Sequence, residues 1–220
     1  MSDYRVPWIN RLARRIIRPI FKVIFKIISR VEVRGFENIP ADPYIMVFNH
    51  VSLFEAPLIV AYWPTFPEIL GASEVWNRPG QNLLAKAYGG IPIDRGEVDR
   101  MAMHRMVDSV LSGRSLMIAP EGGRSHSPGM RKAKPGITYL FDKTGVKILP
   151  VAMVGTTDDF LSNALHGKRP FTSITVGKPF VLPKFDEEGK SGSEIRQEKV
   201  DLVMKKIAEI LPENYRGYYS

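Results

Sequence analysis

The distribution of apolar and polar residues predicts a chain in which short buried strands alternate with helices. Apolar runs of strand length occur at residues 44–48, 115–119 and 146–154. Further strands are expected at 31–34, 68–71 and 172–176, together with a short strand that ends at 94–95. Helices are expected at residues 56–62, 82–88, 97–111, 137–143 and 193–211. Pro150 interrupts one run, so we expect that strand to bend or to lie at a sheet edge. This alternation predicts a single α/β domain over residues 31–220, in which helices flank a mixed, largely parallel central sheet.

The first 30 residues have a different pattern. Residues 8–29 are rich in Ile, Phe, Leu and Val, with a cation at every third or fourth position. On a helix the cations fall on one side and most apolar residues on the other. Pro19 is expected either to kink this helix or to begin a second one.

Two simple interpretations of this segment are excluded. Its uncharged runs are much shorter than the roughly 20 residues that a spanning helix needs. Charges interrupt the apolar region and no small-residue cleavage site follows, so it does not resemble a signal peptide. We expect residues 1–30 to form an amphipathic helix in the membrane interface, with the cations against anionic lipid. A helix packed on its own domain is the alternative.

Composition and charge narrow the chemistry further. The chain has 220 residues and no cysteine, which excludes disulfides, thiolate zinc sites and a cysteine nucleophile. Residues 1–30 contain eight cations and one carboxylate, so they carry +7 of the total net charge of +8. The body of the protein is therefore nearly neutral, which argues against binding of nucleic acid through the fold.

The first candidate site follows the apolar run at 44–48. Asn49 and His50 stand where this strand should end, and Glu55 follows five residues after the histidine. A histidine that an acidic partner holds at the mouth of a cleft is the arrangement of a general base. The alternative is purely structural, because Ser52 and Glu55 also have the spacing of a helix capping box.

Two further stretches have the character of anion sites. Asp94 and Arg95 stand between a predicted strand and helix, where an arginine is well placed to hold an anion, although a surface ion pair is the alternative. Glu121-Gly122-Gly123-Arg124-Ser125 follows the strand at 115–119, and paired glycines allow backbone N–H groups to approach a ligand closely. A glycine-rich surface turn is the alternative there. Lys134 precedes the helix expected at 137, a position that suits a phosphate but is also common on a solvated face.

Taken in order, these stretches resemble the 1-acylglycerol-3-phosphate acyltransferase family. The resemblance rests on Asn49-His50 with Glu55, Gly90 to Arg95, Glu121 to Ser125 and Ile148 to Val151, which match that family's four sequence blocks in order and approximate spacing. It extends from about residue 31 to about residue 180. The family's first block normally has Asp where this chain has Glu55, a side chain with one more rotatable bond.

The resemblance implies an enzyme that transfers a fatty acyl group from a thioester, acyl-CoA or acyl-carrier protein, to the hydroxyl of a lysophospholipid. Lysophosphatidate is the expected acceptor, and phosphatidate the product. The resemblance also implies that His50 is the general base, that Glu55 is its partner, and that the acceptor attacks directly without an acyl-enzyme. Substrate binding is expected from Asn49, Arg95, Glu121, Gly122, Gly123, Arg124, Ser125 and Lys134. Residues around Pro150 are expected to line an acyl groove, and neither a metal nor a cofactor is expected.

Together with the amphipathic first helix, the resemblance predicts a peripheral protein on the cytoplasmic face of the cell membrane, with membrane lipids, the lysophospholipid and the thioester donor as partners. Three alternatives remain open. The chain is a catalytically silent lipid-binding protein, it acylates another lysolipid, or it is a serine hydrolase that uses Ser52 or Ser125 with His50 or His126. The hydrolase has little support, because the chain has no Gly-x-Ser-x-Gly motif.

Overall fold

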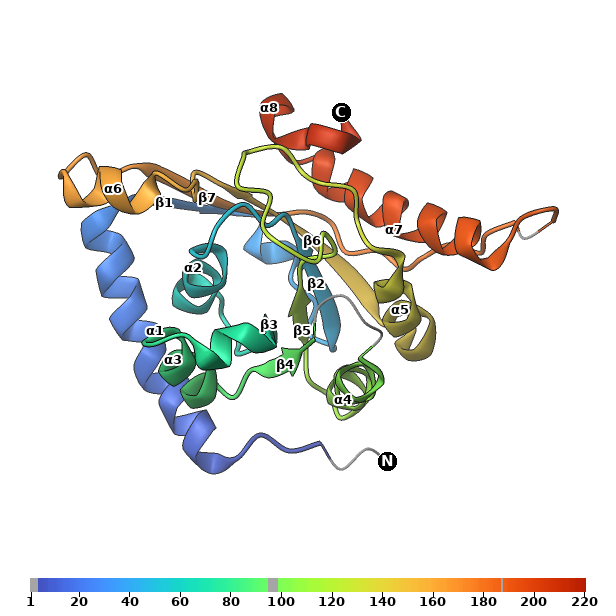
Figure 1. The fold of residues 1–220 in the computed structure, drawn as a ribbon, viewed down its shortest axis with the longest axis horizontal. Helices are drawn as coiled ribbons and strands as arrows, with labels where there is room; N and C mark the ends of the chain where they lie inside the picture. Colours follow the sequence, from blue (N-terminus) through green and yellow to red (C-terminus); the bar gives the residue numbers. More distant parts are fainter. Residues whose placement is uncertain (1–3, 95–98, 187) are drawn as a thin grey trace.

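The computed structural model describes residues 4–94, 99–186 and 188–220 (Figure 1). Its helices are α1 (Trp8–Ile28), α2 (Glu55–Tyr62), α3 (Gln81–Tyr88), α4 (Arg100–Leu111), α5 (Thr138–Thr144), α6 (Phe160–Leu165), α7 (Gly192–Ala208) and α8 (Glu213–Arg216). Its strands are β1 (Arg30–Arg34), β2 (Tyr44–Phe48), β3 (Glu68–Ala72), β4 (Ile91–Ile93), β5 (Leu116–Ile118), β6 (Lys147–Val154) and β7 (Phe171–Val176). The predicted elements are therefore present with small differences at their ends.

The strands form one seven-stranded sheet in the order β1-β7-β6-β2-β5-β3-β4. Only the β6–β7 pair is antiparallel, so the prediction of a mixed, largely parallel sheet is confirmed. The five strands from β6 to β4 run in the same direction. Their carboxyl ends therefore meet at one edge, which is where ligands bind in open α/β sheets.

The core explains why β2 has a continuous apolar sequence. Ile45 and Val47 belong to the cluster packed under α4, α5 and α7, whereas Tyr44, Met46 and Phe48 belong to the cluster under α1 and α2. Successive side chains of a strand point to opposite faces, so both faces of β2 are buried.

Of the two alternatives for the strand containing Pro150, a bend or an edge position, the edge position is wrong. β6 lies between β7 and β2, in the interior of the sheet. The β6–β7 ladder ends at the pair Val151 and Val176, and the Pro150 carbonyl accepts the Gly177 N–H just beyond it, at 2.9 Å. The proline therefore stands where this ladder has already ended, and its missing N–H removes no ladder hydrogen bond.

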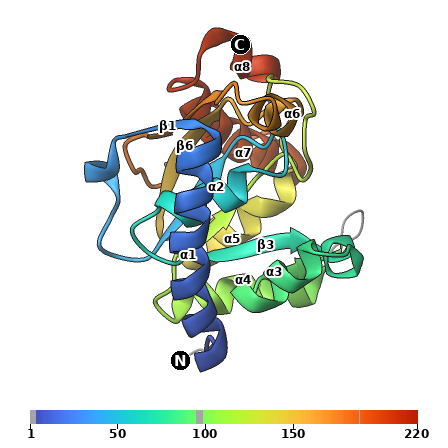
Figure 2. The same ribbon diagram turned by 90° about the vertical axis from the view of Figure 1, so that its left-hand side faces the viewer.

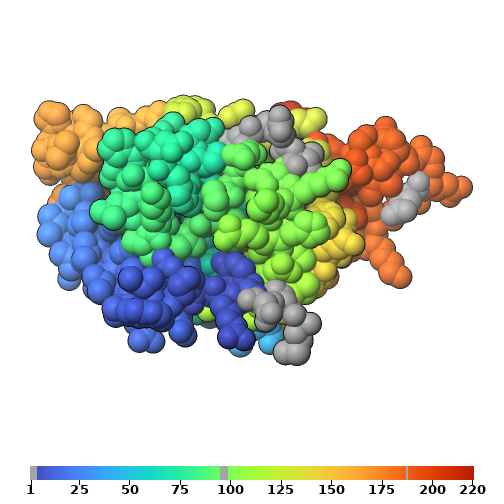
Figure 3. Space-filling view, turned by 60° about the horizontal axis from the view of Figure 1, so that its bottom comes forward, coloured from blue at the N-terminus to red at the C-terminus, as the bar shows by residue number. Residues whose placement is uncertain are grey.

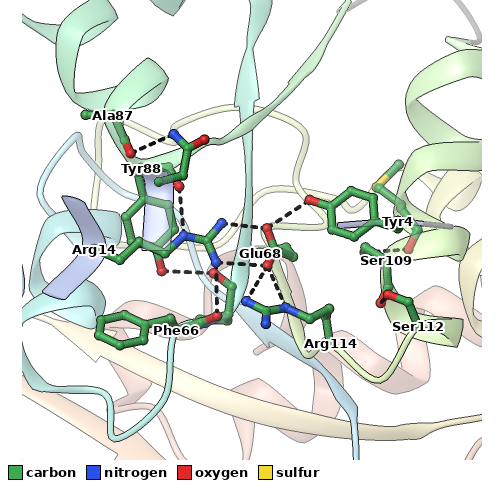
Figure 4. A network of polar contacts seen from close by, with 12 residues as sticks. Tyr4, Arg14, Phe66, Glu68, Ala87, Tyr88, Ser109, Ser112 and Arg114 are labelled. Carbon is green, nitrogen blue, oxygen red and sulfur yellow. Dashed lines mark hydrogen bonds and ion pairs between the residues drawn. The ribbon is translucent and has the colours of Figure 1, made fainter. Parts of the chain in front are cut away.

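The first helix is continuous through Pro19 and packs along α2 and α3 (Figures 1 and 2). Figure 3 shows it at the surface, beside the segment that carries α3. The side of the helix that faces the domain is polar in its first half and apolar in its second half, where Phe25 is buried. Arg14 is buried and donates two hydrogen bonds to the Glu68 carboxylate, at 2.9 and 2.7 Å, and one to the Tyr88 carbonyl, at 2.8 Å. Tyr4 and Arg114 also donate to Glu68 (Figure 4).

The apolar side of α1 faces outward. Its large exposed residues are Trp8, Ile9, Leu12, Ile16, Ile20, Val23, Ile24 and Ile27, of which Trp8 is 69% and Ile27 65% exposed. Four exposed cations, Arg11, Arg15, Lys22 and Lys26, follow one edge of this stripe at helical spacing. Within the described residues, no helix has the length and apolar character to cross a membrane. The helix thus packs on its own domain and still presents an apolar surface to its surroundings.

We predict that Arg14→Met lowers the free energy of unfolding by about 3–5 kcal/mol, because it removes the principal partner of a buried carboxylate. Urea unfolding measures the difference. Arg15→Met is the matched control, since Arg15 is an exposed neighbour on the same helix, and its effect should stay within about 0.5 kcal/mol. Equal effects of the two substitutions would contradict this role for Arg14.

Stability should also depend on the ionisation of Glu68. Burial alone raises the pKa of its carboxyl, but the hydrogen bonds and charge of Arg14, with the charge of Arg114, hold that pKa below the ordinary value of 4.5. Its stabilising contribution is therefore complete above pH 4.5 and is lost as the pH falls through the lower folded value. Urea unfolding between pH 6 and pH 3 should show this loss, and Glu68→Gln should show a shallower dependence.

Candidate active site

A largely apolar cavity of about 780 Å³ lies at the carboxyl edge of the parallel strands. Part of its wall is apolar and comes from α1, α2 and α3, through residues such as Ile17, Phe21, Val60 and Leu84. The polar part includes His50, the cations Arg78, Arg124 and Lys134, and the carboxylates Glu74, Asp94 and Asp99. An imidazole and several charged groups thus face the same space as a long apolar surface, which suits an amphiphilic ligand.

His50 and Glu55 form a hydrogen-bonded pair. The His50 Nδ1 lies 2.9 Å from the Glu55 Oε2, the imidazole is 19% exposed and the carboxylate is fully buried. An ionised carboxylate only accepts hydrogen bonds, so Nδ1 carries the proton and Nε2 keeps its lone pair. This is the tautomer that a general base needs.

Glu55 fulfils both roles that its spacing allowed. Besides His50, its carboxylate accepts the Ser52 N–H at 2.9 Å, which is one half of a capping box. The other half is missing, because α2 begins at Glu55 and the Ser52 Oγ accepts the Phe54 N–H instead. The capping interaction therefore fixes the carboxylate without taking it away from the histidine.

Thr156 is a member of this site that the sequence analysis missed. Its buried hydroxyl donates to the Glu55 Oε1 at 2.6 Å. It stands two residues beyond the end of β6, at the same edge of the sheet as His50. A polar residue just after a predicted parallel strand is a signal that could have identified it.

Asn49 and Glu121 lie differently from the direct substrate contacts expected of them. The Asn49 amide exchanges two hydrogen bonds with the backbone of Met153, at 2.9 and 2.7 Å, and is fully buried. The buried Glu121 carboxylate accepts the N–H groups of His50 and Arg131, at 2.8 and 2.7 Å. Neither Asn49 nor Glu121 is among the described residues that line the cavity. Both side chains hold the backbone around His50 instead of facing a ligand.

The pKa of Glu121 reflects this position. Burial raises the pKa of its carboxyl, and the N–H groups of Arg131 and His50 offset only part of that effect. Each of these N–H groups donates to a different oxygen of the carboxylate. Because the ionised form accepts better at both oxygens, the two donors favour that form.

The glycine-containing loop contacts the histidine segment. The Ser125 N–H donates to the His50 carbonyl at 2.8 Å, and the His126 N–H to the Val51 carbonyl at 3.2 Å. Gly122 has a φ of +67°, and a Cβ there would lie 2.8 Å from the Lys134 side chain. A glycine at this position therefore lets Lys134 lie against the loop.

Not every predicted contact is placed in the cavity. Gly122, Gly123, Arg124 and Lys134 line it, whereas the Ser125 hydroxyl donates to the Ser127 carbonyl. Arg95 lies outside the described residues. The apolar lining comes from the β3–β5 side of the sheet and from α1 to α3, and Pro150 is not among the described residues that line this cavity.

The serine-hydrolase alternative has no geometric support. Ser52 is bonded to its own turn, and His126 pairs with Asp158 at the surface, at 2.9 Å. Across residues 4–94, 99–186 and 188–220, no serine hydroxyl is hydrogen-bonded to an imidazole, and no cluster of three or more His, Asp or Glu side chains is arranged to hold a metal.

Comparison with known proteins decides the family. The family model described as Acyltransferase matches residues 30–154, more than half of the chain. The chain belongs to the acyltransferase family. The matched region contains the His50–Glu55 pair and the Glu121–Lys134 segment, and the protein is therefore an acyltransferase enzyme.

Individual relatives of this acyltransferase act on different lipids. A 1-acyl-sn-glycerol-3-phosphate acyltransferase of Borreliella burgdorferi is 29% identical over 82% of this chain and 73% of its own length. A lyso-ornithine lipid O-acyltransferase of Pseudomonas aeruginosa is 34% identical over 56% of this chain and 47% of its own length. The crystal structure of PlsC, the 1-acyl-sn-glycerophosphate acyltransferase of Thermotoga maritima, matches with a TM-score of 0.66 and 24% identity, over 91% of this chain and 80% of that one. The last likeness confirms the α/β fold.

We predict that Thr156→Val lowers kcat by about tenfold or more without a matching change in KM, because Glu55 loses a hydrogen bond to its charged form. Thr156→Ser should restore most of the activity. Thr157→Val is the matched control, since the Thr157 hydroxyl bonds Asp159 rather than Glu55. Steady-state acyl transfer measures all three, and equal losses in the two valine variants would contradict the assignment.

Proposed function

We propose that this enzyme transfers a fatty acyl group from acyl-CoA or acyl-carrier protein to the hydroxyl of a lysophospholipid, with 1-acylglycerol-3-phosphate as acceptor and phosphatidate as product. The observation that carries the proposal is the His50–Glu55 pair, 2.9 Å apart, at the polar part of a largely apolar cavity. The names of the relatives support the acceptor class.

In this proposal His50 is the general base. Its Nε2 takes the proton of the acceptor hydroxyl while that oxygen attacks the thioester carbonyl, and a C–O bond forms. The C–S bond then breaks, and the leaving thiolate takes the proton back from the imidazolium. Glu55 stabilises the imidazolium between these two transfers. No acyl-enzyme forms, which agrees with a chain that has no cysteine.

The cations of the cavity would bind the acceptor phosphate. Arg124 and Lys134 line the cavity together with Gly122 and Gly123, on the loop that is bonded to the His50 backbone. A phosphate held there stands beside the base, so its glycerol hydroxyl is close to Nε2. Arg95 would contribute to substrate binding, as the family resemblance implies.

The outward apolar side of α1 supports attachment to a membrane surface. The stripe from Trp8 to Ile27 would enter the acyl boundary, and Arg11, Arg15, Lys22 and Lys26 would meet anionic headgroups beside it. The acceptor could then enter the cavity without exposing its chain to water, which costs about 0.8 kcal/mol per CH₂.

A different lysolipid is the second candidate acceptor. The relative at 34% identity is named for a lyso-ornithine lipid, whose headgroup carries an amine. An acceptor screen with one acyl-CoA distinguishes the two, because mass spectrometry separates phosphatidate from acylated ornithine lipid. We expect phosphatidate to form fastest, and faster acylation of lyso-ornithine lipid would overturn the choice of acceptor.

Replacing the base should abolish most activity. We expect His50→Ala to lower kcat by about 10²–10⁴-fold, since general base catalysis contributes about that much. Glu55→Gln should cost about a thousandfold or more, because an amide permits the wrong tautomer at His50. Release of free thiol from acyl-CoA in the presence of lysophosphatidate measures the rate.

His126→Ala is the matched control for these variants, because His126 and Asp158 form a similar pair, also at 2.9 Å, on the surface. Its activity should equal that of the wild type. If His50→Ala is folded, binds vesicles and keeps substantial turnover, the proposed base is wrong. A wild-type protein that consumes no thioester would instead favour a silent lipid-binding protein.

A further inference from the structure

The short helix α6 lies beside the carboxyl-terminal end of α1 and has one anchored side. Phe160 is fully buried, and its ring stands 6.1 Å from that of Phe25 on α1 and 4.9 Å from that of Phe54. Figures 1 and 3 show α6 and this end of α1 at the same corner of the molecule. The position of α6 is therefore set by α1 and by the segment that leads into α2.

Two leucines of α6 are turned outward. Leu161 is 45% and Leu165 79% exposed, and residues four apart lie on the same face of a helix. Leu161 also lines the cavity, as does Leu53, which is 41% exposed. Side chains that are at once exposed and part of the lining stand at an opening. Leu53 and Leu161 therefore mark a mouth of the cavity next to α6.

The loop after α6 is tied to the end of α1. The Arg169 guanidinium donates to the carbonyls of Lys26 and Ser29, at 2.8 and 3.3 Å, and the Arg30 N–H donates to the Pro170 carbonyl at 3.0 Å. These bonds fix the exposed leucines of α6 relative to the apolar stripe of α1, whose last member is Ile27.

The charge of this corner indicates what covers the leucines. Lys26, Arg30, Lys168 and Arg169 are all exposed there. The acidic groups near α6 are at its other end, where Asp159 accepts from Thr157 and Asn163, and Asp158 pairs with His126. Exposed leucines among cations match an anionic lipid surface, into which the leucines insert while the cations meet headgroups.

We propose that α6 is a second membrane-contacting element, which places the Leu53–Leu161 mouth of the cavity at the lipid surface. This inference rests on the proposed membrane attachment of α1 and adds a site to it. The two helices then hold the domain on the bilayer at two places, with the mouth of the cavity beside α6. An acyl chain passes from the bilayer into the cavity between these leucines.

Single-site labelling tests the proposal directly, because the chain has no cysteine and each introduced one is unique. Leu165→Cys, Ile20→Cys and Leu111→Cys are each labelled with an environment-sensitive fluorophore. Leu111, 57% exposed on α4, is the control because α4 lies apart from α6 in the ribbon views (Figures 1 and 2). Vesicles of phosphatidylglycerol and phosphatidylcholine are added to the labelled 220-residue protein. We expect a blue shift of emission at positions 165 and 20 and no shift at 111.

Binding measurements complete the test. Leu165→Gln keeps helix propensity and should weaken vesicle binding by about tenfold, because a leucine is no longer buried in lipid. A shift at position 20 without one at 165, or unchanged binding of Leu165→Gln, would overturn the role of α6 alone. No shift at either position would overturn membrane attachment through α1 as well. A blue shift at 165 that depends on protein concentration without vesicles would assign this face to a second copy of the chain.

Discussion

The carboxyl edge of the central strands depends on a carboxylate that is sealed from water. Glu55 is fully buried, and an ionised group in that environment costs several kcal/mol unless donors surround it. Its donors are the His50 ring, the Ser52 N–H and the Thr156 hydroxyl. They come from the segments after β2 and β6 and from the turn into α2. The carboxylate is stable only if these strands end side by side, so its presence links the chemistry to the parallel register of the sheet.

A second set of hydrogen bonds holds the backbone on either side of the His50–Glu55 pair. Asn49 binds the backbone of Met153 on β6, and Glu121 binds the N–H groups of His50 and Arg131. Each bond joins the histidine segment to a neighbouring strand or loop. These framework contacts fix the position of the His50 backbone, although neither side chain is among the described residues that line the cavity. A polar residue within a sequence motif therefore need not face the cavity.

Much of this arrangement was accessible from the sequence, and the exceptions have physical causes. The apolar run at 44–48 predicted a buried strand, which is present as β2. The candidate residues His50 and Glu55 lie in contact, and the glycine-containing loop is bonded to the His50 backbone. The roles of Asn49 and Glu121 were not accessible, because an amide or carboxylate in a motif has the same sequence whether it meets a ligand or a backbone N–H. Thr156 was missed because its partner Glu55 is 101 residues away in the chain.

The sequence pattern of α1 predicts an amphipathic helix but does not predict which of its sides faces the domain. Helical periodicity separates a polar side from an apolar side, but a helix that turns either side toward the domain satisfies the same pattern. The choice is made by Glu68, 54 residues after Arg14, whose buried carboxylate requires a cation. Once Arg14 turns inward to meet it, the rigid geometry of the helix turns Trp8, Leu12 and Ile16 outward. A buried ion pair in the first half of the helix thus leaves the opposite, apolar side exposed.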